Sequence, residues 1–423
     1  MLKHDAQRSS VNSNERSVHQ WRRDELSYCS NVHSGESLHE VSENIAQYSV
    51  GVRQRRHLPL MHTGLWLSAL AAQALQNPKS LQAFKDHLNQ HGIALSSLNG
   101  FPYGNFHQQQ VKAKVYLPDW SMPQRLSYTQ KLAKILAFCL PEACHRGTIS
   151  TLPLGYRSYW SVEKQQQALQ HLLVLNDFLH QLYLENGRSI LICIEMEPDC
   201  VIDKTDDLIL FFNQFQSLLQ KRHPNQPCYL ASCFDVCHQA VMFESTQRSL
   251  EQILNAEIEV GKIQLSSALR LQRPPQLEDA TLIDLVSQFS EPRYLHQVQV
   301  KDAEKTSRFS DLSDALGRQN REHSDSRSEE EWRIHFHVPI HETRLAEDLL
   351  STTQAQLLET FDQLALWPGD RCKPFLEVET YTWQVLPKQL QPQNPEQLMD
   401  EISKEIQWVE QQLKKRALLS NEP

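Results

Sequence analysis

Short apolar runs alternate along the chain with longer stretches in which apolar residues recur every three or four positions. The short runs predict β-strands, and the longer stretches predict amphipathic helices. Eight runs are assigned to strands, at residues 26–32, 58–67, 93–99, 147–152, 189–195, 229–235, 262–267 and 375–380. Because strand and helix alternate about eight times, the pattern favours an α/β fold, a (β/α)8 TIM barrel of parallel strands. An open, doubly wound sheet is the alternative.

Two helices carry clear boundary signals. In residues 161–186, Ser161 is suited to cap the start of the helix and Gly187 to end it. A helix beginning at Thr205 has Asp206 and Asp207 in its first turn, where acidic side chains suit the helix dipole.

Two further runs, 294–300 and 332–338, also look like strands, which gives ten candidates for eight barrel positions. They flank residues 301–331, which are dominated by charged residues and serine. We interpret residues 291–345 as a hairpin-like insertion with a solvated loop between the seventh and eighth units. The alternative is that one of the eight strands is false.

Apart from an N-terminal tail, the chain is expected to form one domain. Residues 1–22 are polar and predict a disordered tail, and 23–423 predict a single barrel domain. Apolar residues at helical spacing in 395–419 predict a helix that closes the barrel.

Composition excludes several classes of protein. The 423 residues carry a formal charge of −9, so the chain lacks the basic character of a general nucleic-acid binder. The nine cysteines are scattered, which argues against a disulfide framework. Neither a signal-peptide pattern nor a long apolar run is present, so we expect a cytoplasmic protein without a membrane span. No strand is followed by a glycine-rich nucleotide motif.

Polar residues gather where the predicted strands end, the region in which barrel proteins carry their chemistry. Glu195 and Glu197 follow the fifth strand, and Asp235 and His238 follow the sixth. Such carboxylates and imidazoles bind divalent metals or transfer protons. The structural alternatives are that Glu197 pairs with an arginine, that Asp235 caps a helix and that His238 is a core residue.

Two further pairs share a strand face. His335 and His337 suit a metal, or they are solvated residues of the insertion. Glu377 and Glu379, followed by Tyr381 and Trp383, suit a polar pocket with an apolar wall, or an exposed edge strand.

Weaker candidates complete the predicted pocket. Tyr103 and His107 follow the third strand, His33 follows the first, and Gln264 lies in the seventh. The Gln264 amide suits a hydroxylated ligand.

Six segments carry a resemblance to a known family. They are 28–37 (YCSNVHSGES), 99–107 (NGFPYGNFH), 150–154 (STLPL), 234–238 (FDVCH), 335–339 (HFHVP) and 376–383 (LEVETYTW). In this order they resemble the EboE family of bacterial metabolite traffic proteins. The resemblance runs from about residue 26 to 409 and is specific in combination.

That family looks like a branch of the xylose-isomerase-like barrels, which include sugar isomerases, sugar epimerases and an endonuclease. The wider group holds a divalent metal with Glu after the fifth strand, Asp-x-x-His after the sixth, His after the seventh and Glu after the eighth. Glu195, Asp235, His238 and Glu377 match this pattern. Gln264 stands where the seventh-strand His is expected, and His335 or His337 is the candidate substitute.

The resemblance implies a role in moving or preparing a small metabolite, such as a cyclitol or a secondary-metabolite precursor. One hypothesis is an isomerase or epimerase that uses Zn, Mn or Fe, with Glu195 and Glu377 as catalytic carboxylates. A second is a non-catalytic binding or carrier component of an export pathway, with other proteins of that pathway as partners. A nuclease is the third, and the negative charge argues against it.

Overall fold

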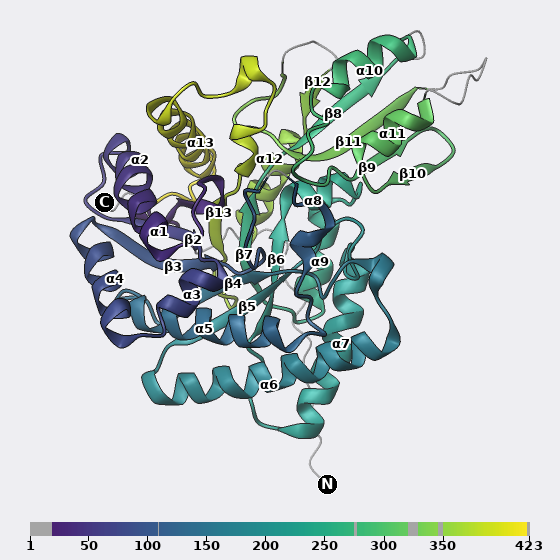
Figure 1. The fold of residues 1–423 in the computed structure, drawn as a ribbon. Coiled ribbons are helices and arrows are strands. Elements are labelled where there is room, and N and C mark those ends of the chain that lie inside the picture. The colour runs from purple at the N-terminus through teal and green to yellow at the C-terminus, as the bar shows by residue number, and fades with distance from the viewer. Residues whose placement is uncertain (1–18, 109, 275–276, 320–328, 346–349, 421–423) are drawn as a thin grey trace.

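Eight parallel strands form a barrel at the centre of the computed structural model (Figure 1). The structure describes residues 19–108, 110–274, 277–319, 329–345 and 350–420. The barrel strands are β1 (Ser27–Tyr28), β2 (Met61–Trp66), β3 (Ile93–Asn99), β4 (Arg146–Thr151), β5 (Ser189–Glu195), β6 (Leu230–Asp235), β7 (Val260–Leu265) and β13 (Phe375–Val378). Hydrogen bonds connect the strands in the order β1-β13-β7-β6-β5-β4-β3-β2. A parallel bridge between Cys29 and Gly64 connects β1 to β2. The predicted (β/α)8 barrel is confirmed.

Helices surround the barrel and cover the outer face of its strands (Figure 1). They are α1 (Leu38–Asn44), a π-helical segment (Ile45–Ser49), α2 (Val50–Arg55), α3 (Ala69–Ala74), α4 (Pro78–Gln90), α5 (Pro123–Cys139), α6 (Val162–Asn186), α7 (Thr205–Arg222), α8 (Val236–Val241), α9 (Thr246–Asn255), α12 (Gln354–Leu364) and α13 (Pro395–Lys415). The predicted boundaries of α6 are confirmed, because Ser161 accepts a hydrogen bond from the Lys164 amide and Gly187 has a φ of 69°. The predicted closing helix is α13.

A second sheet is inserted between β7 and β13. It is antiparallel, with the order β10-β9-β11-β8-β12. Its elements are β8 (Ala268–Arg273), α10 (Asp279–Ser287), β9 (Val298–Lys301), β10 (Thr306–Phe309), α11 (Leu312–Gln319), β11 (Glu330–His337) and β12 (Leu350–Thr352). The inserted segment therefore runs from 268 to 352 and is longer than the predicted insertion of 291–345. The prediction missed strand β8 because only two residues separate it from β7.

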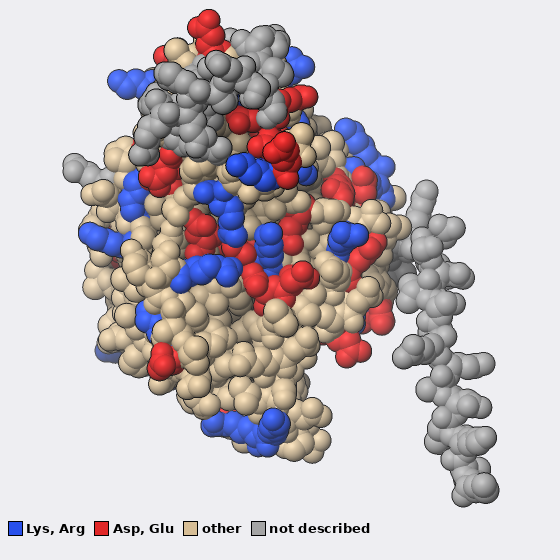
Figure 2. All heavy atoms as spheres, turned by 90° about the vertical axis from the view of Figure 1, so that its right-hand side faces the viewer, with Lys and Arg blue, Asp and Glu red and all other residues tan. Residues whose placement is uncertain are grey.

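The two ends of the described chain lie together. Trp21 is buried and forms a parallel bridge with Leu419. Residues 1–18 of the predicted disordered tail lie outside the described residues. Among the described helices, none is both long and apolar enough to cross a bilayer. On the face shown in Figure 2, acidic and basic side chains are intermixed, and no continuous basic surface is seen.

A buried ion pair fills the barrel interior. The Nζ atom of Lys262 on β7 lies 2.6 Å from Oε1 of Glu377 on β13, and both side chains are fully buried. Burial opposes the charged form of Lys262, but Glu377 and the neighbouring acidic groups outweigh it and raise the lysine pKa. Gly64 on β2 leaves the space for this carboxylate, because a Cβ atom there would lie 1.3 Å from Oε2 of Glu377.

A buried arginine fixes the loop that follows β3. Arg125 on α5 donates hydrogen bonds to the backbone carbonyls of Pro118, Gly100 and Phe101, at distances of 2.8 to 3.0 Å. Burial lowers its pKa to about 10, which leaves the guanidinium charged at neutral pH. The arginine thus holds the segment that carries Phe101 and Pro102 against the barrel.

The first prediction concerns this arginine. Replacing Arg125 with Met leaves three buried carbonyls without a charged donor, so we expect the free energy of unfolding to fall by about 2–4 kcal/mol. Urea denaturation measures the change. Arg125→Lys is the matched variant, because it keeps the charge but cannot reach three carbonyls at once, and it should recover less than half of the loss. An unchanged midpoint in Arg125→Met would contradict this role.

The second prediction concerns the buried ion pair. Lys262→Met leaves Glu377 buried without its cation, so the free energy of unfolding should fall by about 3–5 kcal/mol. The double variant Lys262→Met/Glu377→Leu should be more stable than Lys262→Met alone, because no uncompensated charge remains. Lys79→Met, at an exposed lysine, is the control and should change stability by less than about 0.5 kcal/mol. A double variant less stable than Lys262→Met would show that the charges are not coupled.

Candidate functional site

A cavity opens at the carboxyl ends of the barrel strands. Its polar wall is formed by Asn31, Asn99, Tyr116, Glu195, Glu197, His238, His335, His337 and Glu379. Its apolar wall includes Phe101, Pro102, Phe106, Tyr294 and Tyr381. Such a combination of apolar enclosure and convergent polar groups is typical of a small-molecule site.

Three carboxylates from three strand ends meet at the base of the cavity. They belong to Glu195 at the end of β5, Asp235 at the end of β6 and Glu379 just after β13. One oxygen from each lies within 4.8 Å of the others. Glu379 accepts hydrogen bonds from Asn31 and Asn99 through Oε1, at 2.8 and 3.0 Å, while its Oε2 has no partner. Asp235 likewise keeps a buried, unpartnered Oδ2.

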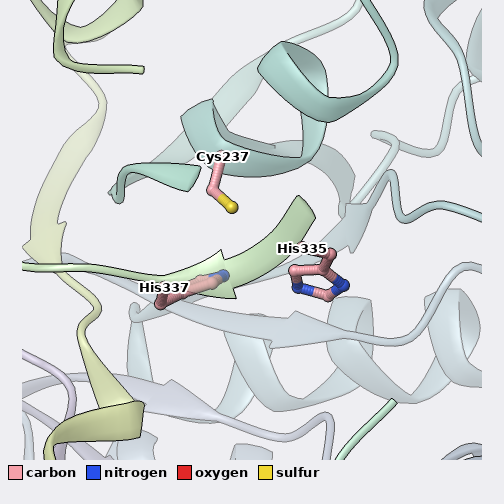
Figure 3. Close-up of side chains that lie close together, drawn as sticks. All are labelled: Cys237, His335 and His337. Carbon is pink, nitrogen blue, oxygen red and sulfur yellow. The ribbon is translucent and has the colours of Figure 1, made fainter. Parts of the chain in front are cut away.

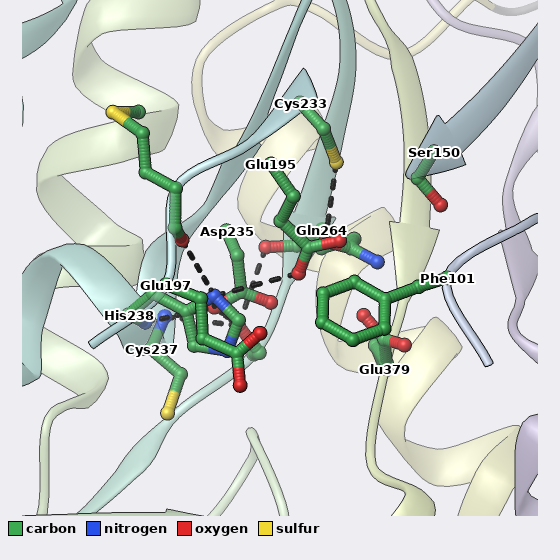
Figure 4. A network of polar contacts seen from close by, with 12 residues as sticks. Phe101, Ser150, Glu195, Glu197, Cys233, Asp235, Cys237, His238, Gln264 and Glu379 are labelled. Atoms are coloured by element: carbon green, nitrogen blue, oxygen red, sulfur yellow. Dashed lines mark hydrogen bonds and ion pairs between the residues drawn. The ribbon is translucent and has the colours of Figure 1, made fainter. Parts of the chain in front are cut away.

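The turn from β6 into α8 holds Asp235 and His238 together. Oδ1 of Asp235 accepts hydrogen bonds from the His238 backbone amide and from the Ser266 hydroxyl, both at 2.8 Å. The predicted capping role of Asp235 is therefore present together with its place in the cluster. Nδ1 of His238 lies 3.4 Å from Oε1 of Glu195 (Figure 4).

The inserted sheet contributes two histidines to the same cavity. Strand β11 pairs with β9 and β8 and carries His335 and His337 on one face. Nδ1 of His337 donates to the Glu379 carbonyl, and its Nε2 is buried without a partner. Figure 3 shows both histidines on the strand, with the Cys237 thiol pointing toward it from the start of α8. Both rings are buried, which excludes the alternative that these histidines are solvated residues of the insertion.

Burial dominates the electrostatics of the cavity. Desolvation raises the pKa of Glu195 well above its usual range, and the neighbouring carboxylates Glu379 and Asp235 add to the shift. Desolvation and then Asp235 raise the pKa of Glu379 to about 8, and desolvation raises that of Glu197 to about 7. Burial lowers the pKa of His337 to about 4. The cavity therefore disfavours several adjacent negative charges unless a cation accompanies them.

Two predicted residues of the eighth and seventh strands lie outside this cluster. Glu377 faces the barrel interior and pairs with Lys262, so Glu379 is the carboxylate that β13 directs to the cavity. Gln264 is buried beside Asp235 in the sheet, where its Oε1 accepts a hydrogen bond from Cys233 at 3.1 Å and its Nε2 has no partner.

Four residues predicted for the pocket lie off the cavity wall. His33 stacks on Tyr48 and hydrogen-bonds to the Tyr28 hydroxyl. Tyr103 packs edge-on against Tyr128, and His107 hydrogen-bonds through Nε2 to the Asn31 carbonyl. Trp383 donates to Glu405 beneath α13. These residues follow strand ends in sequence, but the turns direct their side chains into the surrounding packing.

Several wall residues carried no clear sequence signal. Tyr116 donates a 2.7 Å hydrogen bond to Oε1 of Glu197 and accepts one from Gln297 at 3.0 Å. Tyr116 lies in a 3₁₀ turn (Lys112–Tyr116), and Gln297 lies immediately before β9. Asn31 and Asn99 stood inside the segments of the family resemblance, which was the available signal for them.

No family model matches this sequence, and no curated protein matches it. Solved structures to which the chain is similar include a xylose isomerase-like TIM barrel protein from Mycobacterium smegmatis in complex with magnesium, at 10% identity and a TM-score of 0.47 over 94% of this chain and 98% of that one. They also include the IolI protein with a bound zinc atom, at 10% identity and a TM-score of 0.44 over 92% and 98% of the two chains. A xylose isomerase domain protein from Alicyclobacillus acidocaldarius subsp. acidocaldarius has 11% identity and a TM-score of 0.44 over 93% and 99%.

Proposed function

We propose that this protein is a divalent-metal-dependent isomerase or epimerase acting on a small polyhydroxylated metabolite. Glu195, Asp235 and Glu379 would hold the metal, with His337 as a fourth ligand in place of the absent seventh-strand histidine. The chemistry supplied by the bound metal is the polarisation of a substrate carbonyl and the orientation of its neighbouring hydroxyl.

The donor atoms of the pocket fit such an ion. Carboxylate oxygens and a neutral imidazole nitrogen suit Mn²⁺, Fe²⁺ or Zn²⁺. His337 donates through Nδ1 to a carbonyl, which leaves Nε2 as a free acceptor, the arrangement typical of metal-binding histidines. One ligand atom of His337 lies within 4.8 Å of one of Asp235, so this histidine borders the carboxylate cluster.

The observation that carries the proposal is a set of buried acceptors without donors. Oδ2 of Asp235, Oε2 of Glu379 and Nε2 of His337 are all buried and unpartnered. A buried polar group without a partner costs about 1–3 kcal/mol, and more when charged. A cation held by Glu195, Asp235 and Glu379 would give the two carboxylate oxygens a partner, and His337 borders this cluster because one of its ligand atoms lies within 4.8 Å of one of Asp235.

The chain's own residues supply the rest of the chemistry. Glu195 and Glu379 approach the cavity from different strands, which would let one carboxylate remove a proton and the other return it. Asn31 and Asn99 donate to Oε1 of Glu379 and so fix the orientation of this carboxylate. The Phe101, Phe106 and Tyr381 rings restrict the entry of water to the site.

The resemblance to the EboE family supports a place in metabolite traffic. The carboxylate, amide and imidazole groups that line the cavity suit a small polyhydroxylated molecule such as a sugar or a cyclitol. Other proteins of the same pathway would then supply or accept this metabolite.

A carrier that binds the metabolite without converting it is the second candidate function. It is favoured by Gln264, which replaces a metal-binding histidine of the resembling group, and by the aromatic wall, which offers contact area without a metal. Ligand binding that survives complete removal of metal would support this candidate.

The third prediction tests the metal and the reaction together. The protein loaded with Mn²⁺ should exchange substrate C–H hydrogen for solvent deuterium in a panel of keto-sugars and keto-cyclitols, followed by NMR. Asp235→Asn keeps an oxygen for the helix cap but weakens the metal site, so we expect exchange to fall by more than about 100-fold. The Mn²⁺-dependent gain in stability should also fall, by about 2.7 kcal/mol at a hundredfold excess of Mn²⁺ over Kd.

Asp86→Asn, at an exposed aspartate on α4, is the matched control and should behave as wild type. Undiminished exchange and stabilisation in Asp235→Asn would overturn the metal assignment. Metal-dependent stabilisation without exchange on any member of the panel would favour the carrier.

A further inference from the structure

His238 and His335 face each other in a way that neutral imidazoles do not favour. Their Nε2 atoms lie 3.0 Å apart, and their rings are nearly perpendicular, with an interplanar angle of 85°. A hydrogen bond at this distance needs one nitrogen to carry hydrogen and the other to be bare. The hydrogen bonds at the opposite side of each ring decide whether this condition is met.

A hydrogen bond to the backbone fixes the tautomer of His238. Nδ1 lies 2.8 Å from the Met196 carbonyl oxygen, which can only accept. Nδ1 therefore carries the hydrogen, and in the neutral ring Nε2 is bare.

A hydrogen bond to Gln297 fixes the same tautomer in His335. The Gln297 amide nitrogen donates to the Pro198 carbonyl at 3.2 Å, so its Oε1 is the atom that faces His335. Oε1 accepts from Nδ1 of His335 at 2.7 Å, which leaves Nε2 of His335 bare as well. Two bare nitrogens thus point at one another, and a positive charge is needed beside them.

A third buried acceptor converges on the same point. Oε1 of Glu197 is occupied by the Tyr116 hydroxyl, whereas Oε2 is buried and unpartnered. One ligand atom from each of Glu197, His238 and His335 lies within 4.8 Å of the other two. A shared proton would need only the two nitrogens, while a metal ion also accounts for the carboxylate.

We propose that Glu197, His238 and His335 form a second divalent-metal position in the cavity. It shares no residue with the cluster of Glu195, Asp235, Glu379 and His337. Two imidazoles and one carboxylate suit Zn²⁺ or Fe²⁺ better than Mg²⁺ or Ca²⁺. With zinc–nitrogen bonds of about 2.0–2.1 Å, two nitrogen ligands of a tetrahedral ion lie about 3.3–3.4 Å apart, so the two rings, whose Nε2 atoms are 3.0 Å apart, need only a small separation to share an ion.

The surrounding hydrogen bonds hold the three ligands in place. Gln297 contacts both His335 and Tyr116, and Tyr116 in turn contacts Glu197, so one chain of hydrogen bonds connects two of the ligands. Such outer contacts orient metal ligands and set their tautomers. Cys237 is also near His335, but it packs in an apolar cluster with Val241 and Ala268, and burial raises the pKa of its thiol well above the usual range. We therefore assign Cys237 to packing.

The fourth prediction measures metal content by elemental mass spectrometry after the protein is stripped and reconstituted with Zn²⁺. Wild type should hold two ions per chain. His335→Gln and Glu197→Gln should each hold one, as should Asp235→Asn, and the double variant Asp235→Asn/His335→Gln should hold none. Circular dichroism establishes that each variant is folded, and the two single variants at the second position are independent of one another.

Cys237→Ala is the matched control and should keep two ions. Two ions in both His335→Gln and Glu197→Gln would overturn the second position, as would a wild type that saturates at one ion lost only in Asp235→Asn. Loss of an ion in Cys237→Ala, with none lost in Glu197→Gln, would overturn the ligand set. An ion lost in His335→Gln but none in Asp235→Asn would retain this position and refute the carboxylate site of the proposed function.

Discussion

The cavity is governed by the burial of carboxylates that cannot all be charged without compensation. Glu195, Asp235 and Glu379 lie within contact of one another, and Lys262 beneath them is already paired with Glu377. Amide donors from Asn31 and Asn99 offset part of the charge of Glu379. The remaining bare oxygens need either protons or cations, since isolated buried charges are too costly to persist.

The inserted sheet is part of the site as well as part of the fold. Strand β11 is held on both sides, by β8 and β9, and its pairing with β8 shifts register between Ile334 and His337. This framework fixes the depth at which His335 and His337 enter the cavity. A histidine on the seventh barrel strand would have a different reach, so the insertion gives this cavity its own arrangement of imidazoles.

The barrel could be predicted from sequence because each of its strands is a short apolar run followed by a helical pattern. The proximity of Glu195, Asp235 and His238 was also predictable, since parallel strands bring their carboxyl ends to one mouth. The choice between Glu377 and Glu379 was not. The two residues share a face, but they differ in depth by about 6.6 Å, the rise of two strand residues. Sequence gives the face of a residue, whereas the end of β13 at Val378 decides which carboxylate reaches the cavity.

Loop residues show the same limit. His33 and Trp383 stand at plausible positions in the sequence, yet their side chains are held by Tyr28 and Glu405 away from the cavity. Strand β8 was hidden because Ser266 and Ser267 are the only separation between it and β7. In both cases the deciding information is the path of the backbone after the strand, which periodicity does not record.

The contact between His238 and His335 spans 97 positions of the chain, and it joins helix α8 of the barrel to strand β11 of the inserted sheet. Assembly of the site therefore depends on events that are distant in sequence, because the insertion has to dock before its imidazoles can meet the barrel. Local helices and neighbouring strands form without this step, and long-range closure adds an entropic cost of its own. An ion bound by both imidazoles would therefore offset part of this closure cost and hold the inserted sheet against the barrel.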